Sequence, residues 1–421
     1  MARWLWFASS MAGYLWLRAA LYGVVAVVTA LAAIYLKRFI PEDWPQQIGA
    51  DAVDGILNIL AASMLSVTIF SLSTVVAAYG AATNNVTPRA TKLLIEDKTS
   101  HNALSTFIGA FIFSIVGIVA LRTGVYGESG RLILFLVTIG VIAMIILMLL
   151  RWIEYLSRLG RVNETIEKVE RTVAESLEER LRNPYLGGRA LQEPVPENCF
   201  YIYAQEIGYI QHIDMGALSA IAKKSACEIH VLAPPGKFVN AAIPLVAIDG
   251  VADEDMGGHV RKAFIVGTER SFREDPRFGL AVLCEIGTRA LSSAINDSGT
   301  PIHVIGIGVR VLSLWAQRGE FSAGMTEPKY PAVFVPPLRI EDLFDDFFMP
   351  LARDGAGLLE VMIRLQKAYA ALAATGDAEL ARASRHHSML GIKRSYAALA
   401  LEEDREKLAS SVSPLLFPRH S

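Results

Sequence analysis

Charge and cysteine are both scarce in this sequence, and each scarcity excludes a class of protein. Only 19% of the 421 residues are charged, against about 25% in an ordinary soluble domain. With 52% apolar residues, the chain is too hydrophobic for an intrinsically disordered protein. Its three cysteines lack the short spacing of a zinc or redox pair and indicate no disulfide framework. The net charge of −2 gives no reason to expect a nucleic-acid partner, which needs a clustered basic face.

The shortage of charge is concentrated before residue 153, where long apolar runs occur. A helix needs about 20 apolar residues to cross a hydrocarbon layer about 30 Å thick. Four runs meet this length, at residues 19–36, 55–82, 103–121 and 132–150. We therefore predict an α-helical membrane domain over residues 1–152, with four transmembrane helices in contact with the lipid bilayer.

None of the four runs has an ionisable residue in its middle, which disfavours a proton-coupled carrier because such carriers keep ionisable groups within their spans. Lys and Arg beside the spans predict the orientation, since positive charge stays in the cytoplasm. These residues are densest directly after the fourth run, at Arg151, Arg158, Arg161 and Lys168. We predict that both termini are cytoplasmic.

The second run carries several small polar side chains, and two interpretations stay open. In one, these groups let helices approach closely and form hydrogen bonds across the contact. In the other, they line a water-filled path, which requires a homo-oligomer because four helices leave little room for a pore. The residues are Asn58, Ser63, Ser66, Ser73 and Thr74. The third run has small residues that we interpret as packing positions: Gly109, Ala110, Ser114 and Gly117.

Several motifs resemble those of a bacterial family of predicted inner-membrane proteins, domain of unknown function 2254. They are the Pro88-Arg89 step before the Phe-rich third run, Gly208–Asp214, Gly236–Val239 with Pro244-Leu245, and Arg289–Ser292 with Ile295–Asp297. The resemblance covers most of residues 15–320. It implies a bacterial inner-membrane location and the overall architecture, but no biochemical activity.

Residues 153–183 are expected to form a connecting cytosolic helix that continues the fourth span without a break. Apolar residues recur there every three or four positions from Leu156 to Leu181, which is typical of an amphipathic helix. A strict heptad fails at Ser176 and Arg180. Packing against its own domain and self-association therefore both stay open for this helix.

Residues 199–320 predict a cytosolic α+β domain. We expect strands at 199–211, 228–233, 243–248 and 262–267, with Asp214 and Asp275 as the N-caps of two helices. The turn and strand from Gly236 to Leu245 are similar to those of lipoyl- or biotin-carrier barrels, so we expect a small β-barrel-like part. A carrier activity is not expected, because no lysine occupies the carrier position.

Residues 340–408 predict a helical C-terminal region. Phe344, Phe347 and Phe348 share one face of its first helix, opposite Asp342, Asp345 and Asp346. This face has two interpretations, packing within its own domain and docking onto a protein partner.

The sequence offers no catalytic set. It has no phosphate-binding loop, no zinc-protease helix and no nucleophile elbow. We expect no cofactor, and we interpret His230, His259 and His303 as surface or core histidines rather than metal ligands. Arg270 and Arg289 are the candidate anion-binding residues.

Two functions are consistent with these features. The first is a homo-oligomeric ion channel or pore, lined by the second span and gated by the cytosolic domain. The alternative is a non-conducting scaffold or sensor whose spans anchor a ligand- or protein-binding domain. An enzyme would require a cleft that gathers Arg270 and Arg289 with an acidic residue.

Overall fold

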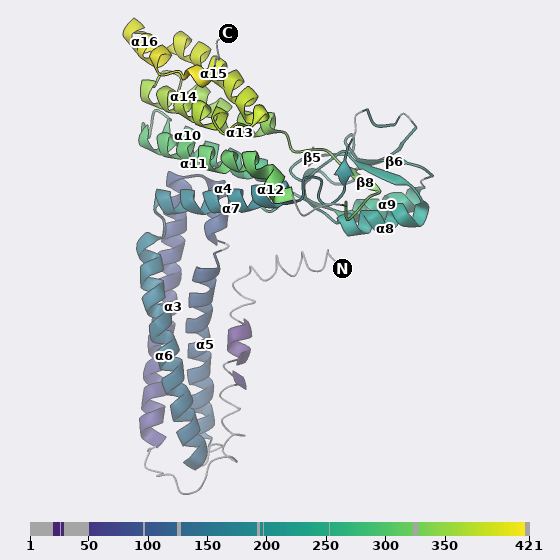
Figure 1. The fold of residues 1–421 in the computed structure, drawn as a ribbon. Helices are drawn as coiled ribbons and strands as arrows, with labels where there is room; N and C mark the ends of the chain where they lie inside the picture. The colour runs from purple at the N-terminus through teal and green to yellow at the C-terminus, as the bar shows by residue number, and fades with distance from the viewer. Residues whose placement is uncertain are drawn as a thin grey trace. The chain divides into compact units, whose positions relative to one another are not determined.

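The computed structural model describes residues 20–25, 27–28, 50–95, 97–123, 128–191, 194–196, 198–251, 253–322 and 327–416. The chain divides into two compact units (Figure 1). The N-terminal unit ends at Thr165, and the C-terminal unit begins at Ile166. Each unit is described by itself.

Three long helices lie side by side in the N-terminal unit (Figure 1). They are α3 (Ala50–Asn85), α5 (Lys98–Arg122) and α6 (Glu128–Arg158), with the short α4 (Pro88–Ile95) between α3 and α5. Pro88 opens α4, a position that needs no backbone N–H. The predicted second, third and fourth spans fall within α3, α5 and α6.

Four helices in the described part of the chain are long and apolar enough to cross a membrane. Three of these segments, Ala52–Thr83, Lys98–Arg122 and Arg131–Arg158, belong to the N-terminal unit, whereas the fourth, Gly299–Phe321, belongs to the C-terminal unit. The predicted first span at 19–36 lies largely outside the described residues. Its described pieces, 20–25 and 27–28, are helical.

Small residues of α5 allow close helix packing in the N-terminal unit. A Cβ atom at Gly109 would lie 3.2 Å from the Tyr22 side chain, and one at Gly117 would lie 3.0 Å from Leu57. Ser114 is fully buried and donates to its own helix, at the Ala110 carbonyl. The interpretation of these positions as packing sites agrees with these contacts.

The connecting helix is separate from α6, so the expected continuous helix is wrong. α6 ends at Arg158, and α7 (Val162–Arg182) begins four residues later. Gly160 lies between them with φ of +84°, a left-handed conformation that interrupts an α-helix and that glycine adopts without strain. The amphipathic pattern of the sequence continues across this break, which is why it did not reveal the interruption.

The strands of the C-terminal unit form two open sheets, so no barrel-like part is present among the described residues. The five-stranded sheet has the order β1-β8-β4-β6-β2 and the three-stranded sheet the order β5-β3-β7. The predicted strand 199–211 is two strands in different sheets, separated by a turn. The strands are β1 (Arg189–Ala190), β2 (Phe200–Tyr203), β3 (Gly208–Ile213), β4 (Glu228–Val231), β5 (Phe238–Val239), β6 (Pro244–Asp249), β7 (Phe264–Gly267) and β8 (Val333–Val335).

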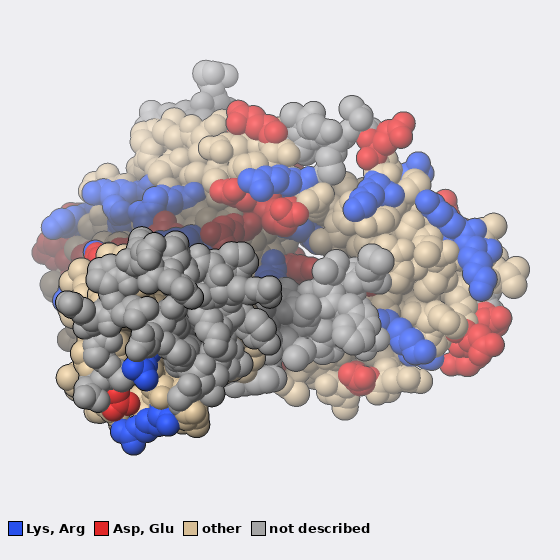
Figure 2. All heavy atoms as spheres, turned by 90° about the horizontal axis from the view of Figure 1, so that it is seen from below, with Lys and Arg blue, Asp and Glu red and all other residues tan. Residues whose placement is uncertain are grey.

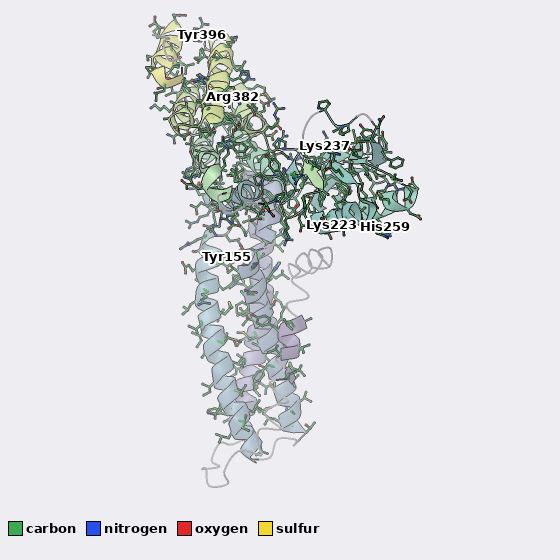
Figure 3. The ribbon with its side chains drawn as sticks, turned by 45° about the vertical axis from the view of Figure 1, so that its right-hand side comes forward. Tyr155, Lys223, Lys237, His259, Arg382 and Tyr396 are labelled. Atoms are coloured by element: carbon green, nitrogen blue, oxygen red, sulfur yellow. The ribbon has the colours of Figure 1, made fainter. Side chains whose placement is uncertain are left out.

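Two helices, α8 (Met215–Ser225) and α9 (Glu254–Ala263), pack on one face of the five-stranded sheet. Lys223 and His259, labelled in Figure 3, mark these two helices. Ile229, Val246 and Ile248 alternate along the covered face and are fully buried together with Leu218 of α8 and Val260 of α9. The predicted N-cap Asp214 accepts a hydrogen bond from the Ala217 N–H at 2.9 Å, which confirms it.

The remaining helices form the second part of the C-terminal unit (Figure 1). They are α10 (Pro276–Ala290), α11 (Gly299–Ser313), α12 (Arg318–Ser322), α13 (Ile340–Asp354), α14 (Leu359–Ala373), α15 (Ala378–Ala398) and α16 (Glu402–Ser410). α11 meets α13 closely, because a Cβ atom at Gly308 would lie 2.0 Å from the ring of Phe347.

The phenylalanine face of α13 is the core of this helical part. Phe344, Phe347 and Phe348 are fully buried, and the ring of Phe348 packs edge-on against Tyr369 of α14 at 5.0 Å. The docking interpretation of this face is therefore wrong, because the chain's own helices cover it. Packing within the domain is confirmed.

Candidate functional site

A cluster of charged side chains lies where α10 begins in the C-terminal unit. Asp275 caps α10, accepting a hydrogen bond from the Phe278 N–H at 3.1 Å, as the sequence predicts. The Asp275 side chain is 3% exposed. Its carboxylate accepts hydrogen bonds from both Nε and Nη2 of Arg270, at 2.7 and 2.9 Å. Burial raises the pKa of the Asp275 carboxyl, and the Arg270 guanidinium opposes that rise.

The Pro-Pro-Gly turn before β5 lies against this carboxylate. Gly236 has φ of +89°, and a Cβ atom there would lie 2.3 Å from an Asp275 oxygen. The next residue, Lys237, is exposed (Figure 3). Glycine is thus required at position 236 both for its backbone conformation and for the close approach of the turn to Asp275.

Arg180 of α7 brings to the cluster a second guanidinium, which is more deeply buried than that of Arg270. It is 8% exposed, and its Nη2 donates to the Pro336 carbonyl at 3.4 Å. Its Nε and Nη1 have no hydrogen-bond partner among the described residues. Burial lowers the pKa of Arg180 to about 10, although the charges of Glu274 and Asp275 act in the opposite direction.

A histidine and a glutamate complete the cluster. His212 of β3 pairs through Nδ1 with Glu274, the residue next to Asp275. Gln211, also of β3, donates to the Glu269 carbonyl at 2.8 Å. The cluster therefore joins α7, β3, the turn before β5 and the start of α10. Two of the motifs that carry the family resemblance, Gly208–Asp214 and Gly236–Val239, contribute to it.

The two predicted anion-binding arginines do not come together. Arg270 precedes α10 and is paired with Asp275, whereas Arg289 lies in the last turn of the same helix and is exposed. The 13 steps from Pro276 to Arg289 rise about 20 Å along the helix. The cleft that an enzyme would need, with both arginines and an acid, does not form around these two residues.

One feature of the sequence pointed to Arg180, whereas none pointed to the His212–Glu274 pair. The two breaks in the heptad of α7 are the positions where this helix makes polar contacts with the rest of its unit. Ser176 donates to the Arg273 carbonyl at 3.3 Å, and Arg180 donates to Pro336. His212 and Glu274 are distant in sequence and belong to no common motif.

Acidic and basic side chains are mixed elsewhere on the surface. On the face displayed in Figure 2, Lys and Arg are interspersed with Asp and Glu over the C-terminal unit.

The small polar side chains of α3 point away from the other described helices. Asn58, Ser63, Ser66 and Ser73 are exposed, and Thr74 is half-buried. Ser66 and Ser73 donate to carbonyls four residues earlier in α3, each at 3.0 Å. Thr74 and Asn58 bond to α3 in the same way.

Ser71 is the hydroxyl that packs between helices on this part of α3. It is 1% exposed and accepts a hydrogen bond from Trp152 Nε1 at 2.9 Å. A Cβ atom at Gly55 or Gly80 would have no neighbouring atom within 4 Å. The outward face of α3 therefore carries small and hydroxyl-bearing residues that no described helix of the chain covers.

The sequence matches the family described as "Predicted membrane protein (DUF2254)" over residues 12–371. It is similar to uncharacterized proteins of Mycobacterium bovis and Mycobacterium tuberculosis, each 28% identical over 116 residues. These residues are 26% of this chain, and the match spans only 22% of each relative. No solved structure matches the chain. Because the family match covers most of the sequence and its apolar helices are long enough to cross a bilayer, the chain belongs to the DUF2254 family of predicted membrane proteins.

Proposed function

We propose that this protein is a bacterial inner-membrane protein whose copies associate through the outward face of α3 and form an ion path there. The observation that carries the proposal is the exposure of Ser63, Ser66 and Ser73 in the single chain. Small residues on the same face, such as Gly55 and Gly80, would let neighbouring helices approach closely.

The hydroxyl groups suit such a path because their hydrogens are already donated to backbone carbonyls of α3. Each of Ser66 and Ser73 donates to its own helix and keeps its oxygen available as an acceptor for a cation or for water. The absence of ionisable groups from these spans supports a weakly selective path rather than a proton relay. Residues from the same face would come from each subunit, so the path requires the oligomer.

In the proposed membrane orientation, both termini of the chain are in the cytoplasm. Arg158 and Arg161 follow α6 directly, and Arg89 and Lys92 lie in the connection between α3 and α5. These two positive regions lie at the same end of the unit, since a Cβ atom at Gly160 would lie 3.5 Å from Ala78 in the last third of α3. The positive-inside rule then puts this end, and the C-terminal unit after it, in the cytoplasm.

Planar-bilayer recording with purified protein tests the pore. Ser66→Leu and Ser73→Leu replace a hydroxyl by a bulky apolar group and should each reduce the single-channel conductance at least tenfold. Val119→Leu is the matched control, because Val119 is an exposed apolar residue of α5 and should leave conductance unchanged. No conductance above that of lipid alone, or a monomeric mass in detergent, would contradict the pore.

The alternative is a non-conducting membrane-anchored sensor, and Arg180 favours it. Its Nε and Nη1 are buried donors with no partner among the described residues, which suits an anionic ligand at the start of α10. Calorimetric titration with inorganic phosphate would test this function. Binding that is lost in Arg180→Met but retained in Arg289→Met supports the sensor, and unchanged binding in Arg180→Met contradicts it.

A further inference from the structure

Three potential metal ligands meet on the face of the five-stranded sheet opposite α8 and α9. Glu228 and His230 belong to β4, and Asp249 belongs to β6. In the antiparallel pair, Glu228 lies directly opposite Asp249, and His230 lies opposite Ala247. Because side chains alternate along a strand, all three side chains project from one face, opposite the face on which Ile229 and Ile248 pack against α8 and α9.

The ligand atoms of these three residues are close enough to share one ion. One nitrogen of His230 and one oxygen each of Glu228 and Asp249 all lie within 4.8 Å of one another. Bonds of about 2.1 Å to a tetrahedral ion would bring ligand atoms to about 3.4 Å apart. Both carboxylates are exposed and can move by this amount through side-chain rotation alone.

His230 has a buried ring without hydrogen bonds. It is 6% exposed, and neither Nδ1 nor Nε2 has a partner among the described residues. Its ring stacks on Phe334 of β8, with centroids 4.9 Å apart, and this contact holds the ring in place. Buried polar groups in proteins are nearly always satisfied, so a ring with two unpaired nitrogens indicates a missing partner.

The charges around His230 favour a cation as that partner. Two carboxylates directly opposite each other in adjacent strands repel. A divalent cation bound between Glu228 and Asp249 would remove this repulsion and would give the buried His230 ring a partner.

We propose that Glu228, His230 and Asp249 bind a divalent first-row transition-metal ion. One imidazole nitrogen with two carboxylate oxygens is a ligand set for zinc, iron or manganese, while calcium and magnesium prefer oxygen ligands alone. Three protein ligands leave at least one coordination position for water or for an external ligand. This site lies in the C-terminal unit and is independent of the pore proposed above.

Zinc titration of the full-length protein tests the site. Protein in detergent is stripped of metal with a chelator, dialysed, and titrated with ZnCl₂ by isothermal calorimetry. One equivalent should bind, and Glu228→Gln combined with Asp249→Asn should weaken that binding at least 100-fold. Both carboxylates are exposed, so these substitutions leave the fold unchanged. His230→Asn should abolish the same equivalent.

His259→Asn is the matched control, because His259 is an exposed histidine of α9 in the same part of the unit (Figure 3). It should bind zinc like the unmodified protein. The same titration with CaCl₂ should give binding at least 100-fold weaker. The proposal is overturned if no equivalent of zinc binds, if the carboxylate and His230 variants bind as the unmodified protein does, or if calcium binds as tightly as zinc.

Discussion

The hydroxyls on the outward face of α3 in the N-terminal unit bond within their own helix, whereas two polar side chains of α7 in the C-terminal unit bond to distant elements. Ser66 and Ser73 donate to carbonyls of their own helix, α3. Ser176 and Arg180 donate instead to residues that follow them by about a hundred positions or more. Lipid offers no hydrogen-bond partner, so a helix in a bilayer is stable when its polar groups bond within it. The bonding of Ser66 and Ser73 therefore suits a helix that crosses a bilayer.

Hydropathy alone does not separate the two units, because one helix of the C-terminal unit also passes as a candidate span. In α6, Ile146, Leu147 and Leu150 are 52–63% exposed. In α11, Val304, Ile305 and Ile307 are fully buried against other helices. The apolar side chains of α11 are thus covered by protein, while those of α6 remain for lipid.

The largest expected effect comes from a buried ion pair in the C-terminal unit. Asp275→Ala removes the partner of Arg270 and an N-cap at once, and should lower the free energy of unfolding by about 3–5 kcal/mol. Calorimetric unfolding of the protein in detergent measures it. Glu402→Ala breaks an exposed pair with Arg405 and should cost less than about 1 kcal/mol. Equal losses would contradict the importance of burial.

The next effect distinguishes a crowded glycine from an uncovered one. Gly308→Ala forces a Cβ atom into the ring of Phe347 and should destabilise the unit by about 1–3 kcal/mol. Gly258→Ala in α9 has open space around it and should stabilise the unit by up to about 1 kcal/mol. Denaturant titrations of both variants give the two signs, and destabilisation by both would contradict the packing described for α11.

Acid should weaken the helical part of the C-terminal unit through His387. Burial lowers the pKa of His387 to about 4, and the nearby Asp345 opposes this, while His386 and Arg394 add to it. The unfolded chain binds the proton near pH 6.5, so stability is lost as the pH falls from about 6.5 toward 4.

We expect a loss on the order of 1–2 kcal/mol by pH 5, measured as the pH dependence of the unfolding free energy. His387→Asn should flatten this dependence, and His303→Asn, at an exposed position of α11, should leave it unchanged. An unaltered slope in His387→Asn would show that another group is responsible.

The smallest effect tests the N-terminal unit. Ser71→Ala removes the acceptor for Trp152 and should cost about 0.6–1.7 kcal/mol, whereas Ser73→Ala removes a hydroxyl that bonds only within α3 and should cost close to nothing. Unfolding in mixed detergent micelles, followed by tryptophan fluorescence, compares them. Similar costs for the two variants would contradict the assignment of Ser71, rather than Ser73, to the contact between α3 and α6.

Local features were predictable from the sequence, and contacts between distant segments were not. The caps Asp214 and Asp275 were found because a cap acts on the next three residues. The break at Gly160 was missed because apolar spacing continues through it. The heptad breaks at Ser176 and Arg180 marked polar contacts but could not identify their partners.

At the two candidate sites, too, the contacts between distant segments could not be predicted from the sequence. Arg270 was recognised, but its pairing with Asp275 depends on a turn and not on a motif. Glu228 and His230 are two residues apart on a strand, which is common, and only the register with β6 adds Asp249. His230 was interpreted as an ordinary core histidine because the sequence does not tell whether a buried ring has hydrogen bonds.

The place of β8 in its sheet has a consequence for synthesis of the chain. β8 lies between β1 and β4, yet Phe334 of β8 follows its partner Arg189 by more than 140 residues. At a ribosomal rate of about 5–20 residues per second, β1 waits roughly seven to thirty seconds for β8 to be made. Until then the β1 edge that β8 pairs is open in the nascent chain, and an open strand edge favours aggregation.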